Sequence, residues 1–338
     1  MNQNRFTALL HILALGAFIV SGSPKINAKD IPKPLASLPT ETINNRLVVV
    51  LPVAHYELRM VLDTGATSTA LFQSSEHEFA DLKKTGSAQI IFPALDESVT
   101  GSKLEQIDIK FGRHIYSPKE LLLIHKRPPI GDRLNFKFDG VLGQDFFMEY
   151  VVEVNPKNQT INLHPKGTNL RRYFFTRTRL TLKDTSPYIL FKNKFPWERR
   201  SSKKQLLLDT GFPGLMVVWN ETHFKLAAGS SNVEKYKAEN RGIFTRADFT
   251  IGKLKFYRAP IFIAANIPIQ AQKRDGIIGA NVVNQFHHVI DFSNGQLLLG
   301  ASRYNYDRID GTFYVPNNET YIFKRFASES DGFKVIIQ

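Results

Sequence analysis

The strongest constraint on this chain is a pattern that occurs twice. "RMVLDTGATS" (residues 59–68) and "QLLLDTGFPG" (residues 205–214) each place an apolar run directly before Asp-Thr-Gly, and the two acids, Asp63 and Asp209, lie 146 positions apart. An apolar run that meets an acid and a glycine predicts a strand ending in a tight turn. A carboxylate at the end of a buried strand costs free energy to desolvate. Two such turns therefore predict a shared function for their acids.

A second repeat lies downstream of each turn. "FDGVLGQDFFMEYVVEVNPKNQTINL" (138–163) aligns without a gap to "RDGIIGANVVNQFHHVIDFSNGQLLL" (274–299), 136 positions further on. Both copies give Asp-Gly, two aliphatic residues and Gly, followed by a strand, a polar turn and a second strand. Two such halves in one chain predict two lobes related by an approximate two-fold axis.

The rest of the sequence predicts an all-β fold. Short apolar runs separated by Gly, Pro, Asn and Asp are typical of strands, and only residues 74–84 and 220–238 are expected to be helical. We expect two pseudo-two-fold-related lobes, at 43–168 and 169–303, with an active-site cleft between them. Residues 304–338 have no counterpart in the first half. They are expected to form a C-terminal extension that adds strands to the second lobe or braces the pair.

The N-terminal region predicts export. Residues 1–28 combine one positive charge, 15 apolar-leaning residues and small residues suited to cleavage, which is typical of a signal peptide. An N-terminal anchor is the alternative, although a spanning helix needs about 20 residues. Residues 29–42 are expected to be a linker or a short pro-segment. The chain has no cysteine, which excludes disulfides and lipid attachment through cysteine. We expect a periplasmic or secreted protein.

The net charge of +13 is concentrated in basic clusters at 170–183 and 197–204. A solvated basic face is the favoured interpretation, and association with an anionic envelope surface is the alternative. No nucleic-acid-binding motif accompanies the charge, so the basic composition alone does not predict binding to DNA or RNA.

A two-fold axis between the halves would bring Asp63 and Asp209 face to face. Two carboxyls about 3 Å apart cannot both ionise, so they would share one proton and titrate in coupled steps. The ionised member can take a proton from a water molecule while the neutral member donates to a peptide carbonyl. This chemistry predicts peptide hydrolysis and requires neither a metal nor a cofactor.

The neighbours of the two acids have predicted supporting roles. Thr64 and Thr210 can hydrogen-bond across to the opposite turn, and Gly65 and Gly211 leave room for close approach. The aliphatic-Gly segments can pass beside the turns and hold them in place. The candidate support set is Thr64, Gly65, Ala66, Thr210, Gly211, Phe212, Val141, Leu142, Gly143, Ile277, Ile278 and Gly279.

With both elements present twice, the sequence resembles the bilobal aspartic peptidases of the pepsin and retropepsin type, over roughly residues 43–303. The resemblance implies a cleft between the lobes, hairpin flaps and cleavage of extended peptides. The sequence looks closest to tandem retropepsin-like bacterial aspartyl proteases, because Ala66 and Phe212 stand where pepsin-like enzymes usually carry Ser or Thr. Loss of that hydroxyl should raise the pKa of the pair and give a mildly acidic to near-neutral optimum.

Two features depart from the pepsin-like pattern. Phe212-Pro213 is bulky, and it either shapes a subsite or marks a lobe that is losing activity. The flap candidates are residues 90–107, turning around Asp96-Glu97-Ser98, and the shorter segment 238–248.

Other interpretations have less support. Asp139 and Asp275 lack a following Thr-Gly and are expected to form turns. The His287-His288 pair has no partner spacing that favours zinc. A catalytically inactive peptide-binding or regulatory module on the same fold is the main alternative function. Because both halves lie in one chain, a monomer should suffice for activity.

Overall fold

The computed structural model describes residues 32–43, 45–74, 77–92, 97–125, 138–183, 185–219, 221–230, 236–238, 242–265, 274–303, 311–315, 319–323 and 334–337. The proposed signal segment 1–28 therefore lies outside the described residues, as does residue Asp96 at the tip of the first flap candidate. Among the described residues, no helix is long and apolar enough to cross a membrane.

The first lobe is built on a sheet in the order β6-β7-β10-β5-β11-β4-β3-β8-β9, with β2 paired to β3. Its strands are β2 (Glu41–Ile43), β3 (Arg46–Val53), β4 (Tyr56–Leu62), β5 (Ala70–Phe72), β6 (Lys84–Phe92), β7 (Glu97–Leu104), β8 (Ile109–Phe111), β9 (His114–Tyr116), β10 (Leu121–Ile124) and β11 (Gly140–Leu142).

The second lobe repeats this arrangement. Its strand order β15-β16-β21-β17-β20-β19-β18 corresponds one to one to β3-β4-β11-β5-β10-β7-β6 of the first lobe. The strand directions agree too, because β11 is parallel to β4 and β21 is parallel to β16. The strands are β15 (Ser186–Asn193), β16 (Ser202–Asp209), β17 (Met216–Trp219), β18 (Tyr236–Ala238), β19 (Gly242–Ile251), β20 (Leu254–Ala264) and β21 (Gly276–Gly279).

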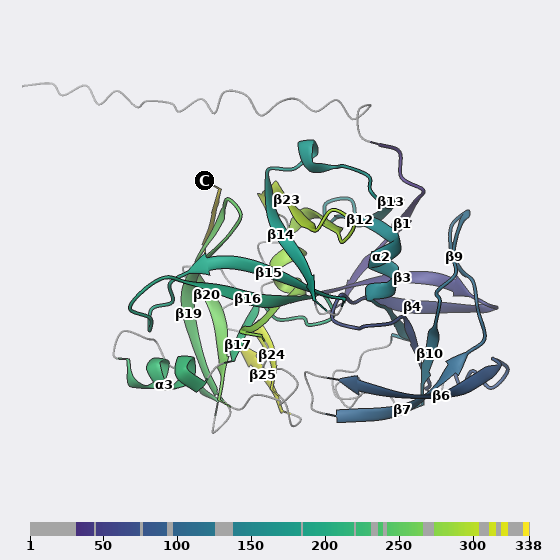
Figure 1. The fold of residues 1–338 in the computed structure, drawn as a ribbon, viewed down its shortest axis with the longest axis horizontal. Helices are drawn as coiled ribbons and strands as arrows, with labels where there is room; N and C mark the ends of the chain where they lie inside the picture. Colours follow the sequence, from purple (N-terminus) through teal and green to yellow (C-terminus); the bar gives the residue numbers. More distant parts are fainter. Residues whose placement is uncertain are drawn as a thin grey trace, which may run out of the picture. The chain divides into compact units, whose positions relative to one another are not determined.

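Six further strands join the lobes, in the order β1-β13-β12-β22-β23-β14, and continue through β14 into the second lobe (Figure 1). At the centre, Val152, Glu153 and Val154 of β12 pair with Ile290, Val289 and His288 of β22. Glu153 and Val289 are equivalent in the sequence repeat, so the local two-fold axis passes between them. The strands are β1 (Ala36–Pro39), β12 (Tyr150–Asn155), β13 (Thr160–Pro165), β14 (Thr176–Lys183), β22 (Phe286–Asp291) and β23 (Gln296–Arg303).

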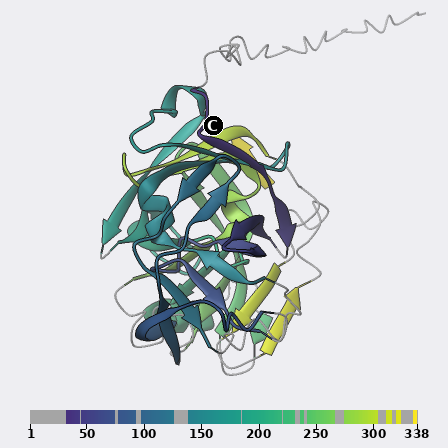
Figure 2. The same ribbon diagram turned by 90° about the vertical axis from the view of Figure 1, so that its right-hand side faces the viewer.

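The predicted fold class is confirmed: the chain is mostly β and has two similar lobes, which lie on opposite sides in Figure 1 and are turned by 90° in Figure 2. β1 (36–39) and most of β2 (41–43) lie in the segment 29–42 expected to be a linker or pro-segment. After residue 303, β24 (Gly311–Val315) pairs with β25 (Glu319–Phe323), and β26 (Lys334–Ile337) pairs with β20 of the second lobe.

Helices are few and short: α2 (Gln144–Glu149), α3 (Glu221–Gly229), α4 (Ala280–Val283) and the 3₁₀ turn η2 (Arg171–Tyr173). The expected helix at 74–84 is wrong over its described part, residues 77–83, which is irregular until β6 begins. Its apolar residues, Phe79 and Leu82, reach the core from turns, and Phe79 has a φ of 54°. Of the predicted helix at 220–238, the described residues form α3 and, at 236–238, the strand β18.

The hairpins predicted as flaps are both present as paired strands. In the first lobe β6 pairs with β7 from Lys84 and Leu104 to Phe92 and Glu97. Glu97 and Ser98, part of the expected turn, therefore belong to a strand, and residues 93–96 lie outside the described residues. In the second lobe β18 pairs with β19.

Candidate active site

Each Asp-Thr-Gly turn follows a central strand of its lobe. β4 ends at Leu62, directly before Asp63, and Asp209 is the last residue of β16. The predicted aliphatic-Gly segments pass beside them. Val141 and Leu142 pair with Val61 and Leu62. Ile277, Ile278 and Gly279 pair with Leu207, Leu208 and Asp209.

Further backbone hydrogen bonds fix both turns in place. The backbone N of Asp63 donates to the carbonyl of Leu142 at 3.0 Å, and Gly279 N donates to Leu215 O at 2.9 Å. Gly143 N donates to the hydroxyl of Thr69 at 3.2 Å. Each acid is thus held at a defined position at the end of a buried central strand by the parallel strand beside it.

Two threonines connect the turns to each other. Thr64 N donates to the Thr210 hydroxyl at 3.0 Å, and Thr210 N donates to the Thr64 hydroxyl at 3.1 Å. Each hydroxyl in turn donates to the opposite strand, Thr64 to Leu208 O at 2.6 Å and Thr210 to Leu62 O at 2.8 Å. Both threonines are buried. This reciprocal set, which we call the threonine clasp, fixes one turn relative to the other.

Replacement of Thr64 by alanine should destabilise the fold by about 2–4 kcal/mol, because it leaves two backbone groups of the second lobe, Thr210 N and Leu208 O, without their partner at about 1–3 kcal/mol each. Thr64→Ser keeps the hydroxyl and should cost only about 1 kcal/mol for the lost methyl group. Urea unfolding of the two variants measures the difference. Equal midpoints for serine and alanine would show that the clasp contributes no stability.

The carboxyls of the two catalytic candidates lie close enough for each to shift the pKa of the other. The glycine of each turn also lies against the carboxyl of the other. A Cβ atom on Gly65 would come within 2.5 Å of the Asp209 Cγ, and one on Gly211 would come closer still to the Asp63 carboxyl. The structure thus brings Asp63, Asp209 and the predicted Thr and Gly neighbours together at one place.

Backbone amides donate hydrogen bonds to one oxygen of each carboxyl. Gly65 N and Ala66 N donate to Oδ1 of Asp63 at 2.8 and 3.2 Å, and Phe212 N donates to Oδ1 of Asp209 at 2.9 Å. Ala66 and Phe212 supply only their backbone N–H groups here, since neither side chain carries a hydroxyl. Both carboxyls therefore lack the additional donor that a Ser or Thr side chain would supply.

The electrostatics of the pair place one proton between the acids. Burial raises the pKa of Asp63, although the amides of Gly65 and Ala66 and the charge of Arg46 oppose this shift. Burial and the negative charge of Asp63 raise the pKa of Asp209 to about 7. Their mutual hydrogen bond lowers the pKa of Asp63 and raises that of Asp209. The two acids therefore titrate as a pair that holds one proton jointly, and the charge of Asp63 is among the causes that raise the pKa of Asp209.

Sequence reasoning missed two arginines. Arg46 is 7% exposed, and its Nε donates to the carbonyl of Gly211 at 2.6 Å, so a first-lobe side chain holds the second-lobe turn. In the β3–β4 hairpin Val48 pairs with Val61, which sets Arg46 opposite Asp63. The register of the β3–β4 hairpin could therefore have predicted that this arginine lies next to Asp63. Arg274 is the second cation, and its charge lowers the pKa of Asp209.

Gln144 is a further residue that the motifs did not indicate. It follows Gly143 at the start of α2 and is 1% exposed. Its Nε2 donates to Thr64 O at 2.9 Å, while its Oε1 accepts from the Thr185 hydroxyl at 2.7 Å. It therefore joins the first turn to the second lobe. The equivalent residue of the second half is Ala280, so this link has no counterpart across the axis and no repeat signal.

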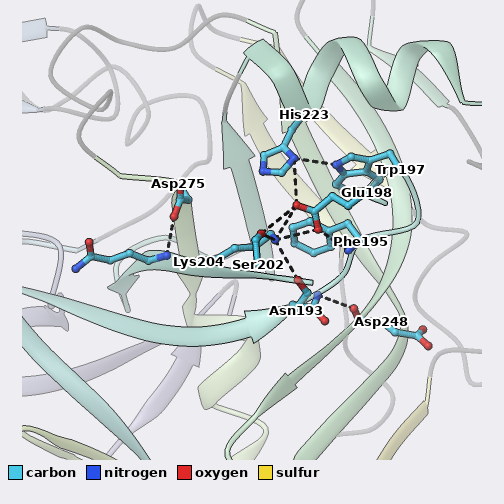
Figure 3. Close-up of polar contacts among 10 residues, drawn as sticks. Asn193, Phe195, Trp197, Glu198, Ser202, Lys204, His223, Asp248 and Asp275 are labelled. Carbon is cyan, nitrogen blue, oxygen red and sulfur yellow. Dashed lines mark hydrogen bonds and ion pairs between the residues drawn. The ribbon is translucent and has the colours of Figure 1, made fainter. Parts of the chain in front are cut away.

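The side chains of Asp139 and Asp275 accept hydrogen bonds from backbone N–H groups at equivalent positions of the two lobes. Asp139 Oδ2 accepts from Arg59 N at 2.8 Å, and Asp275 Oδ2 accepts from Gln205 N at 2.7 Å (Figure 3). Each fixes the loop before its aliphatic-Gly segment to the central strand. The structure does not bring either acid into contact with the Asp63–Asp209 pair.

A second buried charge cluster is structural. Lys204 is 2% exposed, and its Nζ contacts both carboxylate oxygens of Glu198 at 2.9 Å and Ser202 Oγ at 2.7 Å (Figure 3). Its charge also lies over the Phe195 ring. The ion pair is fully engaged in holding the loop after β15 to β16. Over the described ranges, no group of three or more His, Asp or Glu residues could hold a metal ion.

Comparisons with known proteins give similarity at the level of fold alone. No family model matches the sequence, and no curated protein matches it. Basic 7S globulin from soybean is similar with a TM-score of 0.49 at 11% identity, covering 80% of this chain and 96% of that chain. An aspartic proteinase from Irpex lacteus is similar with a TM-score of 0.49 at 14% identity, covering 78% of this chain and 97% of that one.

Proposed function

We propose that this protein is an aspartic endopeptidase that hydrolyses peptide bonds with water activated between Asp63 and Asp209. The observation that carries the proposal is the close approach of the two turns, in which each acid follows an equivalent strand and lies against the glycine of the opposite turn. The threonine clasp supports it, because the reciprocal bonds fix the spacing that sharing one proton requires.

The raised pKa of Asp209 suggests a division of work between the acids. Asp63, ionised and stabilised by the amides of its own turn, takes a proton from the attacking water. Asp209, protonated, donates a hydrogen bond to the scissile carbonyl and polarises it. As the tetrahedral intermediate breaks down, the leaving amine receives a proton from the pair, and the starting state is restored. Every proton is accounted for by the two carboxyls, the water and the amine.

The pH dependence of this chemistry follows from the raised pKa values. Activity requires the singly protonated pair, and the proton on Asp209 is lost as the pH rises through about 7. We expect kcat/KM to fall tenfold per pH unit on the alkaline side of that value. A pH–rate profile of peptide cleavage measures both limbs. A maximum below about pH 3 would contradict the raised pKa of the pair.

A peptide-binding module without catalysis is the competing function. The two are separated by incubating the chain, beginning at residue 29, with a mixed peptide library and identifying products by mass spectrometry. Cleavage at defined bonds supports the endopeptidase. Saturable binding of intact peptides, without any product, would support the module instead.

Four further properties belong to the proposal. An extracytoplasmic location, periplasmic or secreted, is suggested by the apolar segment within residues 1–28. Membership of the retropepsin-like branch is suggested by Ala66 and Phe212. A monomer is suggested because both acids come from one chain, and sedimentation beside an activity titration tests it. The basic clusters suggest association with an anionic surface, and we infer no nucleic-acid partner.

A further inference from the structure

Each lobe carries a small apolar cluster next to its acid. Side chains alternate between the faces of a strand, so that Leu62 and Met60 join the main core while Val61 joins the first of these clusters. The first cluster is Val48, Val61, Ala70, Phe72, Leu122, Ile124 and Val141, and the second is Leu207, Val217, Trp219, Phe262, Ala264 and Ile277.

The two clusters occupy equivalent positions. Phe72 pairs with Ile124 in the first lobe, as Trp219 pairs with Ala264 in the second. Ala66 packs against the first cluster and Phe212 against the second. Because these residues lie three positions after Asp63 and Asp209, each cluster adjoins one of the two acids. A peptide held at the acids would therefore present side chains to both clusters.

One position breaks the equivalence. Phe138 packs against the first cluster and meets the Phe72 ring edge to face, with 5.6 Å between centroids. The equivalent residue in the second lobe is Arg274, whose guanidinium carbon lies 5.4 Å from the centroid of the Trp219 ring. A cation thus stands where the first lobe has an aromatic ring, and the tryptophan face holds it in place.

The guanidinium of Arg274 lacks an acidic partner. Its Nε is buried without a hydrogen bond, and over the part of the chain that the structure describes no carboxylate forms an ion pair with it. A guanidinium has five N–H donors in a planar fork that fits a carboxylate. A buried donor without a partner costs free energy, which a ligand can recover by accepting a hydrogen bond.

An alternative role for Arg274 is to neutralise the charge of Asp209, but the contacts of Arg274 fit this role less well than binding of a ligand. A guanidinium placed for that purpose would form an ion pair with the carboxylate, and Arg274 forms none with Asp209. Its charge nevertheless reaches Asp209 and lowers the pKa of that acid. Arg274 is therefore close enough to Asp209 to affect its pKa, while its buried Nε has no hydrogen-bond partner.

We propose that Arg274 binds an acidic side chain of the substrate, so that the protein prefers peptides with Asp or Glu near the scissile bond on the side that contacts the second lobe. This inference rests on the proposed function and names its substrate class. The apolar first cluster, with Phe138 at the equivalent place, favours an uncharged side chain on the other side. The geometry therefore assigns an asymmetric preference, apolar on one side and acidic on the other.

The test uses end-blocked peptides that differ only by Glu or Gln at each of three positions on either side of the scissile bond. End-blocking leaves the side chain as the only variable carboxylate. Wild type should cleave the Glu peptide with kcat/KM about tenfold or more above the Gln peptide, at one position on one side, which is typical of a charge-assisted hydrogen bond.

In Arg274→Gln this ratio should fall to about one, and in Arg274→Glu a Lys peptide should become preferred over the Glu peptide. Lys253→Gln is the matched control, because Lys253 is also a cation over an aromatic ring, 5.5 Å from the centroid of Phe175. It should keep the wild-type ratio. The same ratio in wild type and Arg274→Gln, or a wild-type preference for Gln, would overturn the inference.

The inference can be tested separately from the proposed function. The same peptide pairs are titrated against Asp63→Asn by calorimetry, which measures binding without turnover. Tighter binding of the Glu peptide that is lost in the Asp63→Asn, Arg274→Gln double variant supports the acidic preference even where no cleavage occurs. Equal binding of Glu and Gln peptides would overturn it, whereas absence of cleavage alone contradicts only the endopeptidase proposal.

Discussion

Asp63→Asn is expected to abolish peptide cleavage while leaving the fold intact. An asparagine amide cannot accept the proton of the attacking water, and a general base of this kind contributes about 10²–10⁴-fold to the rate. We expect kcat to fall at least about 10³-fold. Asn keeps an oxygen that can accept from the amides of Gly65 and Ala66, so the turn should persist. Initial rates on one library-derived peptide, beside circular dichroism, measure both outcomes.

Asp275→Asn is the matched control for this change. Asp275 is an acid in the second repeat whose carboxylate accepts a hydrogen bond from Gln205 N, and no described contact joins it to the Asp63–Asp209 pair. Its amide variant should retain activity within a few-fold. If cleavage survived in Asp63→Asn but was lost in Asp275→Asn, the proposed assignment of the chemistry to Asp63 and Asp209 would be wrong.

Gly211→Ala should produce the second large loss of activity. A Cβ at this position would overlap Cγ and both oxygens of the Asp63 carboxyl. The acids would have to move apart, and displacement of reacting groups by about 1 Å can cost about 10²-fold. The backbone of Gly211 does not have the positive φ that would strain an alanine. The loss therefore reports on the approach of the two turns. It is measured as kcat/KM on the same peptide.

Gly229→Ala supplies the comparison, since a Cβ on this residue at the end of α3 has no atom within 4 Å. It should leave kcat/KM unchanged. If Gly211→Ala were as active as Gly229→Ala, the close packing of the turns around the carboxyl pair would not be needed for turnover.

Much of this architecture was predictable because it repeats. Strand, turn, aliphatic-Gly segment and closing hairpin recur at fixed offsets, and the structure gives both copies the same strand order and direction. The proximity of Asp63 and Asp209 follows from the two-fold relation that the repeat implies. So does the threonine clasp, since equivalent turns on such an axis must meet through equivalent atoms.

The features that escaped prediction are those that break the symmetry or depend on tertiary context. The residues equivalent to Gln144 and Arg274 in the other half are Ala280 and Phe138, which differ from them in chemistry. The repeat therefore gives no signal that indicates Gln144 or Arg274. The missed strand β1 is four residues long, and it is defined by pairing with β13 across more than a hundred positions. The apolar spacing of Phe79 and Leu82 favours a helix, but both residues pack from turns.

The central claim is that Asp63 and Asp209 hold one proton jointly up to about neutral pH. Carboxyl ¹³C chemical shifts of aspartate-labelled protein, followed from pH 3 to 9 in wild type and in Asp63→Asn, measure this most directly. We predict a carboxyl that titrates near pH 7 in wild type and loses that high midpoint when its charged neighbour is removed. Complete ionisation of every aspartate by about pH 5, within the ordinary range of the side chain, would contradict it.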